Sequence, residues 1–315
     1  MGVFFAALFA VAILLLIAAP GYIFIKKKIL SVECIPGFSK VLLFVCQPAL
    51  AIYTLADAEF SVEMLRNLGL IMVGAILIHA VMLSLSCFVM RKKFGEVFPR
   101  IATLATTFAN CAFFGIPIIE AVMGKEEASE LIIYTTVYAM IMNILGWTVG
   151  SAIISKSKKH ISLKKIFVNP YMLGVLLGLP FFIFSFAVPE ELQSLMDMIT
   201  LLGKMTTPLS MLIIGMRLAT AEMREVFGKV RIYVTALVKL VVMPLVAFLI
   251  IYLFPLPTEA KQTFYIICAC PTASIVLNFS EIIGEGQKEA AATVLLSTIM
   301  SIATIPIMVL MLGLF

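Results

Sequence analysis

Residues 110 to 120, NCAFFGIPIIE, place an asparagine, a cysteine, a glycine and a proline inside a stretch that is otherwise apolar. A proline removes a backbone donor and clashes with the preceding helical turn, and a glycine lowers the cost of leaving the helix. A helix broken inside hydrocarbon frees N–H and C=O groups that protein or a water-lined cavity must satisfy. The stretch therefore predicts a helix break at Gly115 and Pro117, beside Asn110 and Cys111.

A second stretch, PTASIVLN at 271–278, has the same character. Pro271 is followed by Thr272 and Ser274, and Asn278 lies one helical turn further on. The N-terminus of a half-helix presents free N–H groups and partial positive charge, which suit an anion such as a carboxylate. The residues that we predict to bind this substrate are Asn110, Cys111, Gly115, Pro117, Pro271, Thr272, Ser274 and Asn278.

Ionisable side chains within apolar segments are further candidates, because a charge there is costly unless it is paired or faces water. Lys239 and Glu120 are predicted to attract substrate or to couple an ion, although a lysine can also extend toward the interface. His79 could relay protons, or it could simply be hydrogen-bonded within a helical bundle. Tyr138 and Asn143 could line the same cavity, and helix packing explains them equally well.

The segments that carry these residues are long and apolar. Hydrophobic residues make up 62% of the chain and charged residues 13%, against roughly 45–50% and about 25% in soluble domains. The apolar blocks reach the roughly 20 residues that a bilayer requires. The sequence predicts an all-α polytopic membrane protein. Its ten candidate spans are 3–25, 38–56, 67–90, 100–122, 129–154, 168–188, 196–217, 230–254, 261–283 and 289–313.

Charge alternates from loop to loop. Most of the 23 lysines and arginines follow the odd-numbered spans, whereas acidic residues dominate the opposite loops. The positive-inside rule then predicts a multi-pass protein of the cell membrane with both termini extracytoplasmic and the 155–167 loop cytoplasmic. Because the basic residues are divided among short loops, the net charge of +5 does not indicate a nucleic-acid partner.

The two halves of the chain resemble each other. Pro48 and Pro208 lie in similar contexts 160 residues apart, and Gly124 and Gly284 do the same. An even span number with the central loop inside gives the halves opposite orientations. Inverted repeats of this kind are typical of secondary transporters, whose sites form where broken helices meet. The predicted units are a first repeat over 1–154, a linker over 155–167 and a second repeat over 168–315.

Three segments, NCAFFGIPIIEAVMG, TPLSMLIIGMRLA and PTASIVLNFSEIIG, resemble the auxin efflux carrier family. That family includes plant PIN auxin carriers and bacterial permeases assigned to malate or malonate, and the likeness runs along nearly the whole chain. One departure lies in the second break, where Ile275 stands at a position that is often asparagine in bacterial members. The long cytoplasmic loop of many plant members is also missing, so the substrate stays open.

The resemblance implies ten helices arranged as in bile-acid transporters, with helices 4 and 9 crossing at their prolines near the membrane midplane. It implies a scaffold domain from helices 1, 2, 6 and 7 and a transport domain from helices 3–5 and 8–10. It also implies elevator-type movement of an organic anion and a homodimer formed through the scaffold.

The predicted function is a secondary active or facilitative transporter of a small carboxylate, with no cofactor and with H+ or Na+ as candidate coupling ions. A membrane sensor of the same fold, which binds a carboxylate without moving it, is the alternative. An enzyme is not expected, because the two histidines lie far apart and no nucleophile–base or metal-ligand cluster accompanies them.

Overall fold

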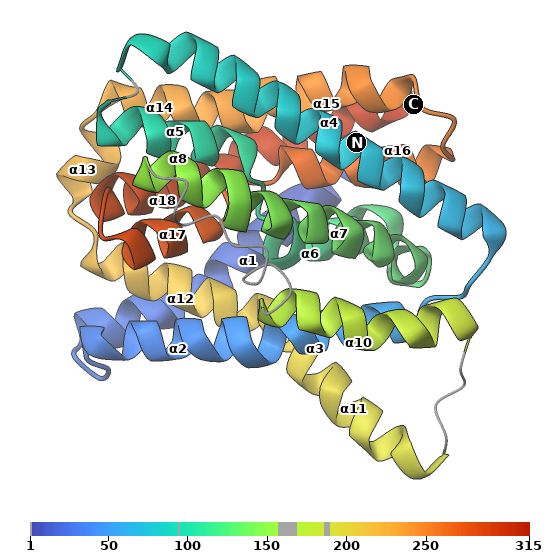
Figure 1. The fold of residues 1–315 in the computed structure, drawn as a ribbon. Coiled ribbons are helices and arrows are strands. Elements are labelled where there is room, and N and C mark those ends of the chain that lie inside the picture. The colour runs from blue at the N-terminus through green and yellow to red at the C-terminus, as the bar shows by residue number, and fades with distance from the viewer. Residues whose placement is uncertain (1, 94, 157–168, 186–189) are drawn as a thin grey trace.

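The computed structural model describes residues 2–93, 95–156, 169–185 and 190–315, and throughout these residues the ordered elements are helices, without a β-strand. The longer helices run in roughly the same direction across the molecule (Figure 1). Within the described ranges, seven helical segments are long and apolar enough to cross a membrane, and Cys111–Met123 and Pro170–Phe184 are shorter apolar helices. The prediction of an all-α, multi-pass membrane protein is confirmed. Nearly all of the predicted linker 155–167 lies outside the described residues.

The helices of the first half are α1 (Gly2–Lys26), α2 (Ile35–Val41), α3 (Gln47–Ala56), α4 (Val62–Met90), α5 (Val97–Thr107), α6 (Ile116–Met123), α7 (Lys125–Leu145) and α8 (Ser151–Ser155). Those of the second half are α10 (Pro170–Phe184), α11 (Glu190–Lys204), α12 (Thr206–Thr220), α13 (Met223–Phe227), α14 (Val230–Leu237), α15 (Met243–Tyr252), α16 (Thr258–Ala269), α17 (Ile275–Ile283) and α18 (Gln287–Met308).

Helices α1, α2, α3, α10, α11 and α12 form a first group, in which α1 packs along α12, and α3 packs along α10 and α11. Glycine permits these close crossings: a Cβ at Gly215 would lie 1.8 Å from the backbone oxygen of Ala18, and one at Gly174 would lie 2.5 Å from that of Pro48. Small residues let membrane helices approach in this way.

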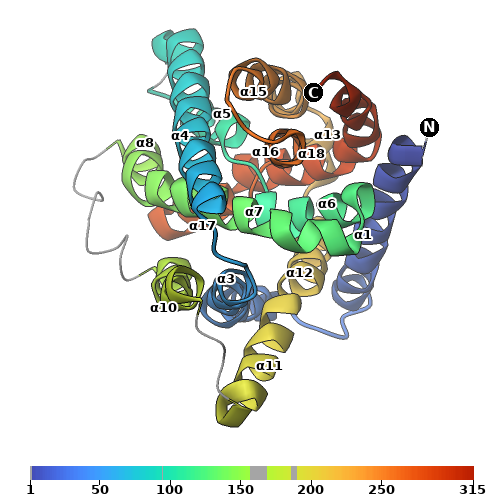
Figure 2. The same cartoon turned by 90° about the vertical axis from the view of Figure 1, so that its right-hand side faces the viewer.

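The remaining helices, α4–α8 and α13–α18, form a second group. Within it α4 packs on α5 and α7, α15 on α16, and α14 on α18. Figure 2 shows these helices above α3, α10, α11 and α12. Helix α1 also touches α6 and α18, so the two groups meet along it.

Three prolines widen the helices that contain them. The π-helical turns Leu42–Cys46, Cys111–Gly115 and Val238–Val242 each end one residue before an X–Pro pair that begins the next α-helix, at Pro48, Pro117 and Pro244. A proline ring clashes with the carbonyl four residues back and cannot donate to it, and a wider turn accommodates both defects. These prolines therefore distort a helix that continues beyond them.

One of the two helix breaks lies at the predicted position, and the other does not. Helix α5 ends at Thr107, and Phe108–Asn110 leaves the helix; helix α16 ends at Ala269, and Pro271 lies in the gap before α17. The two gaps pair as a short antiparallel bridge between Ala109 and Thr272. The break predicted at Pro271 is found there. The break predicted at Gly115 and Pro117 was wrong in position, because that proline is absorbed by a π-helical turn.

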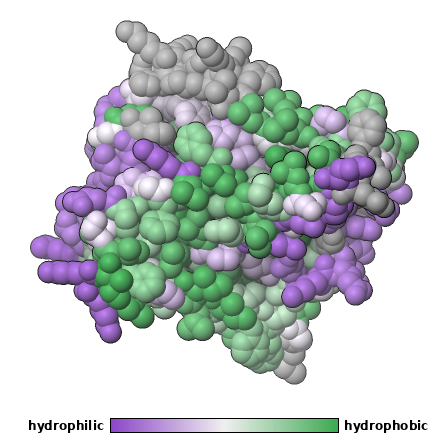
Figure 3. Space-filling model, turned by 90° about the horizontal axis from the view of Figure 1, so that it is seen from below, coloured by the Kyte–Doolittle hydropathy of each residue, from purple (hydrophilic) through white to green (hydrophobic). Residues whose placement is uncertain are grey.

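Many large hydrophobic side chains lie on the outside of the molecule. Phe44, Leu177 and Leu201 are among the large hydrophobic side chains that are mostly exposed. Seen from the side of α2, α10 and α11, an apolar band lies between hydrophilic ends (Figure 3). This distribution suits a protein whose girdle contacts lipid.

Candidate functional site

The gaps in the two broken helices are held together by backbone hydrogen bonds. The Asn110 N–H donates to the Pro271 carbonyl over 2.8 Å, and the Ala273 N–H donates to the Phe108 carbonyl over 2.9 Å. The Thr272 hydroxyl adds a bond to the Ala105 carbonyl, and its N–H donates to the Ser297 hydroxyl of α18. The backbone groups freed by the breaks are thus partly satisfied within the protein, as a membrane interior requires.

A cavity of about 40 Å³, here called the crossing cavity, lies against this bridge. By the same measure a single water needs only about 10–15 Å³, so the space admits a small polar occupant. Its lining residues come from both groups of helices. They are Leu43, Gln47, Ala109, Asn110, Cys111, Ala112, Phe113, Ala139, Met142, Asn143, Tyr171, Ala273, Ser274, Ile275 and Asn278.

Asn110 and Asn278 face the crossing cavity from the two broken helices. Asn110 is 3% exposed, and its Nδ2 has no hydrogen-bond partner among the described residues. Ser274 precedes the first turn of α17, so the N-terminus of that helix starts beside the cavity. None of the described lining residues is charged. The cavity thus offers amide donors and a helix N-terminus in place of a fixed charge.

Asn143 of α7 provides another part of the cavity wall. Its Nδ2 donates to the Ala139 carbonyl, and its Oδ1 accepts from the Asn169 side chain over 3.2 Å. Tyr171 is buried and donates to the Thr136 carbonyl over 3.1 Å. These bonds join α7 to the start of α10 and fix that wall of the cavity.

Cys111 also lines the crossing cavity, whereas the predicted substrate-binding residues Gly115, Pro117, Pro271 and Thr272 do not. Gly115 lies in the π-helical turn, where a Cβ would meet Cys270 Sγ at 3.4 Å, and Pro117 begins α6. Pro271 and Thr272 contribute the hydrogen bonds of the bridge. The helices accordingly pair through Phe108–Asn110 and Pro271–Ala273, whereas the resemblance implied a crossing at both prolines.

Lys239, His79 and Tyr138 form a buried cluster behind the bridge. The Lys239 Nζ donates to the Cys268 carbonyl in the last turn of α16 over 2.9 Å, where the helix end carries partial negative charge. The His79 ring lies 5.1 Å from the Tyr138 ring, and its Nδ1 contacts the Ala75 carbonyl at 2.6 Å. All three side chains are fully buried, and none lines the crossing cavity.

Glu120 lines a separate cavity. Its companions there include Tyr53, Lys125 and Lys204. This places Glu120 away from the crossing cavity, near the loops that the charge pattern assigns to the extracytoplasmic side.

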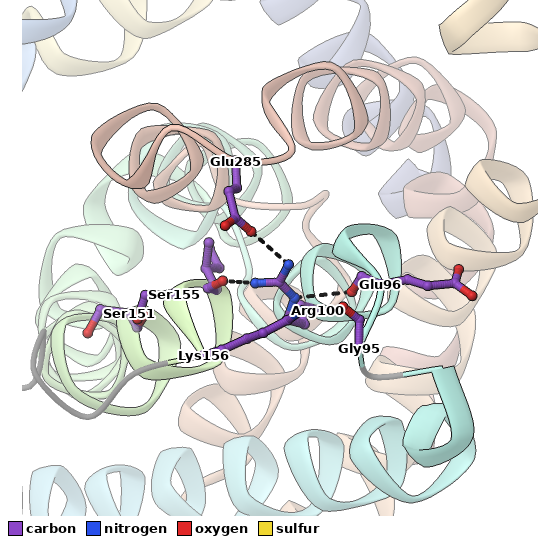
Figure 4. A network of polar contacts seen from close by, with 8 residues as sticks. Gly95, Glu96, Arg100, Ser151, Ser155, Lys156 and Glu285 are labelled. Atoms are coloured by element: carbon purple, nitrogen blue, oxygen red, sulfur yellow. Dashed lines mark hydrogen bonds and ion pairs between the residues drawn. The ribbon is translucent and has the colours of Figure 1, made fainter.

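A buried arginine connects the two broken helices at the end of the molecule that carries the basic loops, here called the basic end. Arg100 of α5 is 2% exposed and pairs with Glu285, just beyond α17, over 2.7 Å. Its guanidinium also donates to the Glu96 and Ile154 carbonyls (Figure 4). Lys156 donates to the Gly95 carbonyl beside it. Three helices of the second group are thereby fastened to one side chain.

Sequence reasoning missed two polar lining residues, Gln47 and Tyr171. Each had a local signal, because Gln47 stands immediately before Pro48 in an apolar span and Tyr171 follows the helix-capping pair Asn169–Pro170. Only the packing of α3 and α10 against the bridge brings them to the cavity.

Paired broken helices inside a bundle of apolar helices, with a polar cavity between them, define the class of this protein as an α-helical membrane transporter. Residues 6–164 and 156–309 match the family model described as "Membrane transport protein". The chain belongs to that family, the auxin efflux carrier family.

The chain is also similar to a Rhizobium meliloti (strain 1021) protein described as "Putative malonate transporter". The two are 28% identical over 143 residues, which amount to 45% of this chain and 43% of that relative. The likeness thus covers less than half of each protein.

Proposed function

We propose that this protein is a secondary active or facilitative transporter that binds a small carboxylate in the crossing cavity. The observation that carries the proposal is the Asn110 side chain, buried against that cavity with its Nδ2 unpartnered. A buried donor without an acceptor costs about 1–3 kcal/mol. A carboxylate oxygen in the cavity would supply that acceptor.

The lining residues favour an anion that is bound weakly enough to be released again. Gln47, Asn110, Asn143 and Asn278 bring side-chain amides to the cavity, and the α17 N-terminus adds a partial positive charge. These groups attract a carboxylate without the strong pairing that a buried lysine or arginine would give. Weak, multiple contacts suit a carrier.

A dicarboxylate such as malonate or malate is the substrate class that we propose first. The Rhizobium meliloti relative is described as "Putative malonate transporter", and its similarity to this chain over 143 residues supports the choice. Four amide side chains around one small cavity are also enough to contact two carboxylates.

We further propose the architecture of two inverted five-helix repeats, with helices 1, 2, 6 and 7 as scaffold and the rest as transport domain. Contacts related by the same offset of 160 residues support it. Gly215 meets Ala18, and Gly178 meets Leu55, which is the same pair with the halves exchanged. Thr206 donates to the carbonyl of Cys46, its own counterpart 160 residues earlier.

Elevator movement of the transport domain against the scaffold follows from this division as a proposal. We place both termini outside the cytoplasm on the charge pattern, and we propose a homodimer through the scaffold. Lys239, His79 and Glu120 are the groups proposed to couple H+ or Na+.

Replacement of the cavity amides tests the binding site. Purified Asn110→Ala and Asn278→Ala are expected to bind malonate and malate roughly 10- to 100-fold more weakly, since each loses a hydrogen bond to a charged ligand. Ligand-induced thermal stabilisation measures the affinity. Asn67→Ala is the matched control, because Asn67 is also 3% exposed but does not line the cavity. Equal weakening by all three variants would refute the site.

A further inference from the structure

A chain of cavities leads from the crossing cavity to the basic end of the molecule. A middle cavity shares Leu43, Phe113, Ser274 and Asn278 with the crossing cavity. An outer cavity of about 220 Å³ shares Arg217, Leu277 and Ala291 with the middle one. Substrate arriving from the basic loops would pass these three spaces in turn.

The Arg217–Glu281 ion pair lies where the outer cavity meets the middle one. Arg217 Nη1 lies 2.5 Å from Glu281 Oε1, and Nη2 donates to the Ser39 hydroxyl over 3.3 Å. Arg217 belongs to α12 and Glu281 to α17, so the pair spans the boundary between the two groups of helices. The pair thus lies at the junction of the two cavities.

The two partners face different spaces. Arg217 lines both the outer and the middle cavity, whereas Glu281 lines the outer cavity alone. Among the described residues of the middle cavity, Arg217 carries the sole charge. The side chain of Arg217 is 15% exposed and that of Glu281 is 41% exposed. If the pair breaks, the Glu281 carboxylate can therefore be hydrated at little cost in free energy, whereas the Arg217 guanidinium cannot.

The neighbouring Arg100–Glu285 pair provides the contrast. Glu281 and Glu285 lie one helical turn apart in sequence at the end of α17, yet their arginines come from different groups of helices. Arg100 is held by two backbone carbonyls of its own group. The Arg100 pair fastens the second group internally, and the Arg217 pair can break when the groups move apart.

We propose that Arg217 is a second carboxylate-binding residue, placed on the path to the crossing cavity, and that Glu281 is its internal competitor. When the path is empty, Glu281 occupies the guanidinium and the path is closed. An incoming carboxylate takes the place of Glu281 on Arg217, so no arginine is left unpaired and the path opens. This proposal rests on the proposed function.

Opposite effects of the two partners test the exchange. Malonate uptake is measured in proteoliposomes, with the substrate presented to the basic-loop face. Arg217→Gln is expected to raise KM roughly tenfold or more, because a charge-assisted bond to the substrate is lost. Glu281→Gln removes the competitor and is expected to lower KM severalfold. Arg217→Lys keeps the charge without the forked geometry and should lie between Arg217→Gln and wild type.

The matched control is Arg231→Gln. Arg231 pairs with Glu289 over 3.7 Å, and neither side chain lines the outer or the middle cavity. The variant therefore removes a positive charge and an ion pair without altering the path. Its KM should equal that of wild type.

A merely structural ion pair gives another outcome, since either substitution breaks it. If Arg217→Gln and Glu281→Gln change KM in the same direction and lose thermal stability together, the exchange is refuted while the transporter stands. If wild type moves no carboxylate, the proposed function itself fails and the exchange fails with it.

Discussion

Arg100 and Arg217 pair with glutamates at or just beyond the C-terminal end of α17, and the two arginines differ in how deeply they are buried. Arg100 is almost completely buried and donates to Glu285 and to two backbone carbonyls. Breaking a buried, hydrogen-bonded charge is far more costly than breaking a pair on the surface. The Glu285 carboxylate is half exposed, which moderates that cost.

Removal of this carboxylate should destabilise the protein measurably. Glu285→Ala leaves the Arg100 Nη2 without its partner, and we expect a loss of about 1–3 kcal/mol in unfolding free energy. The solvent-exposed Lys288–Glu222 pair is the control, and Glu222→Ala should cost at most about 1 kcal/mol. Thermal unfolding in detergent compares them. Equal melting temperatures for the two variants would contradict this account of Arg100.

The residue types of the site could be predicted only in part from the sequence. Polar side chains near a break, such as Asn110, Ser274 and Asn278, lie on the crossing cavity. Gly115 and Pro117 do not, because their conformational effect acts within the helix itself. The sequence also does not show which distant helices complete the wall of the cavity, so Tyr171 was missed.

At the scale of elements, proline proved an ambiguous marker. Pro271 lies in a true gap, whereas Pro48, Pro117 and Pro244 lie at the second residue of a helix that follows a π-helical turn. A missing N–H can be accommodated by widening the helix, and no residue type alone decides between widening and rupture. That the chain contains several long apolar helices was easier to predict, because bilayer thickness imposes their length.

Helix contact in the first group depends on glycine. At Gly215 an added Cβ would strike the backbone of α1, so Gly215→Ala must push α1 and α12 apart, and overpacking of this kind costs about 1–3 kcal/mol. Gly69→Ala is the control, since an added Cβ there meets nothing within 4 Å. Alanine at that helical position should stabilise by up to about 1 kcal/mol. Thermal unfolding of both variants decides, and an unchanged melting temperature for Gly215→Ala would contradict the close crossing.

At the scale of the whole molecule, the proposed movement requires α17 to shift relative to α12. A short bis-maleimide bridge between Arg217→Cys and Glu281→Cys should stop malonate flux. The flux of the same double-cysteine variant before the reagent is added is the reference, because both substitutions are already present in it. A bridge between Arg231→Cys and Glu289→Cys joins α14 to α18 within the second group and should leave flux unchanged. Undiminished flux through the first bridged protein would exclude an elevator that separates these helices.

The central claim is that this protein moves a small carboxylate across the membrane, and counterflow tests it most directly. Liposomes that contain the purified protein are loaded with unlabelled malonate, and labelled malonate is added outside. We predict accumulation of label above equilibrium, greatly reduced by Asn110→Ala and absent from liposomes without protein. Malonate binding without any protein-dependent entry of label would contradict the account and favour a sensor of the same fold.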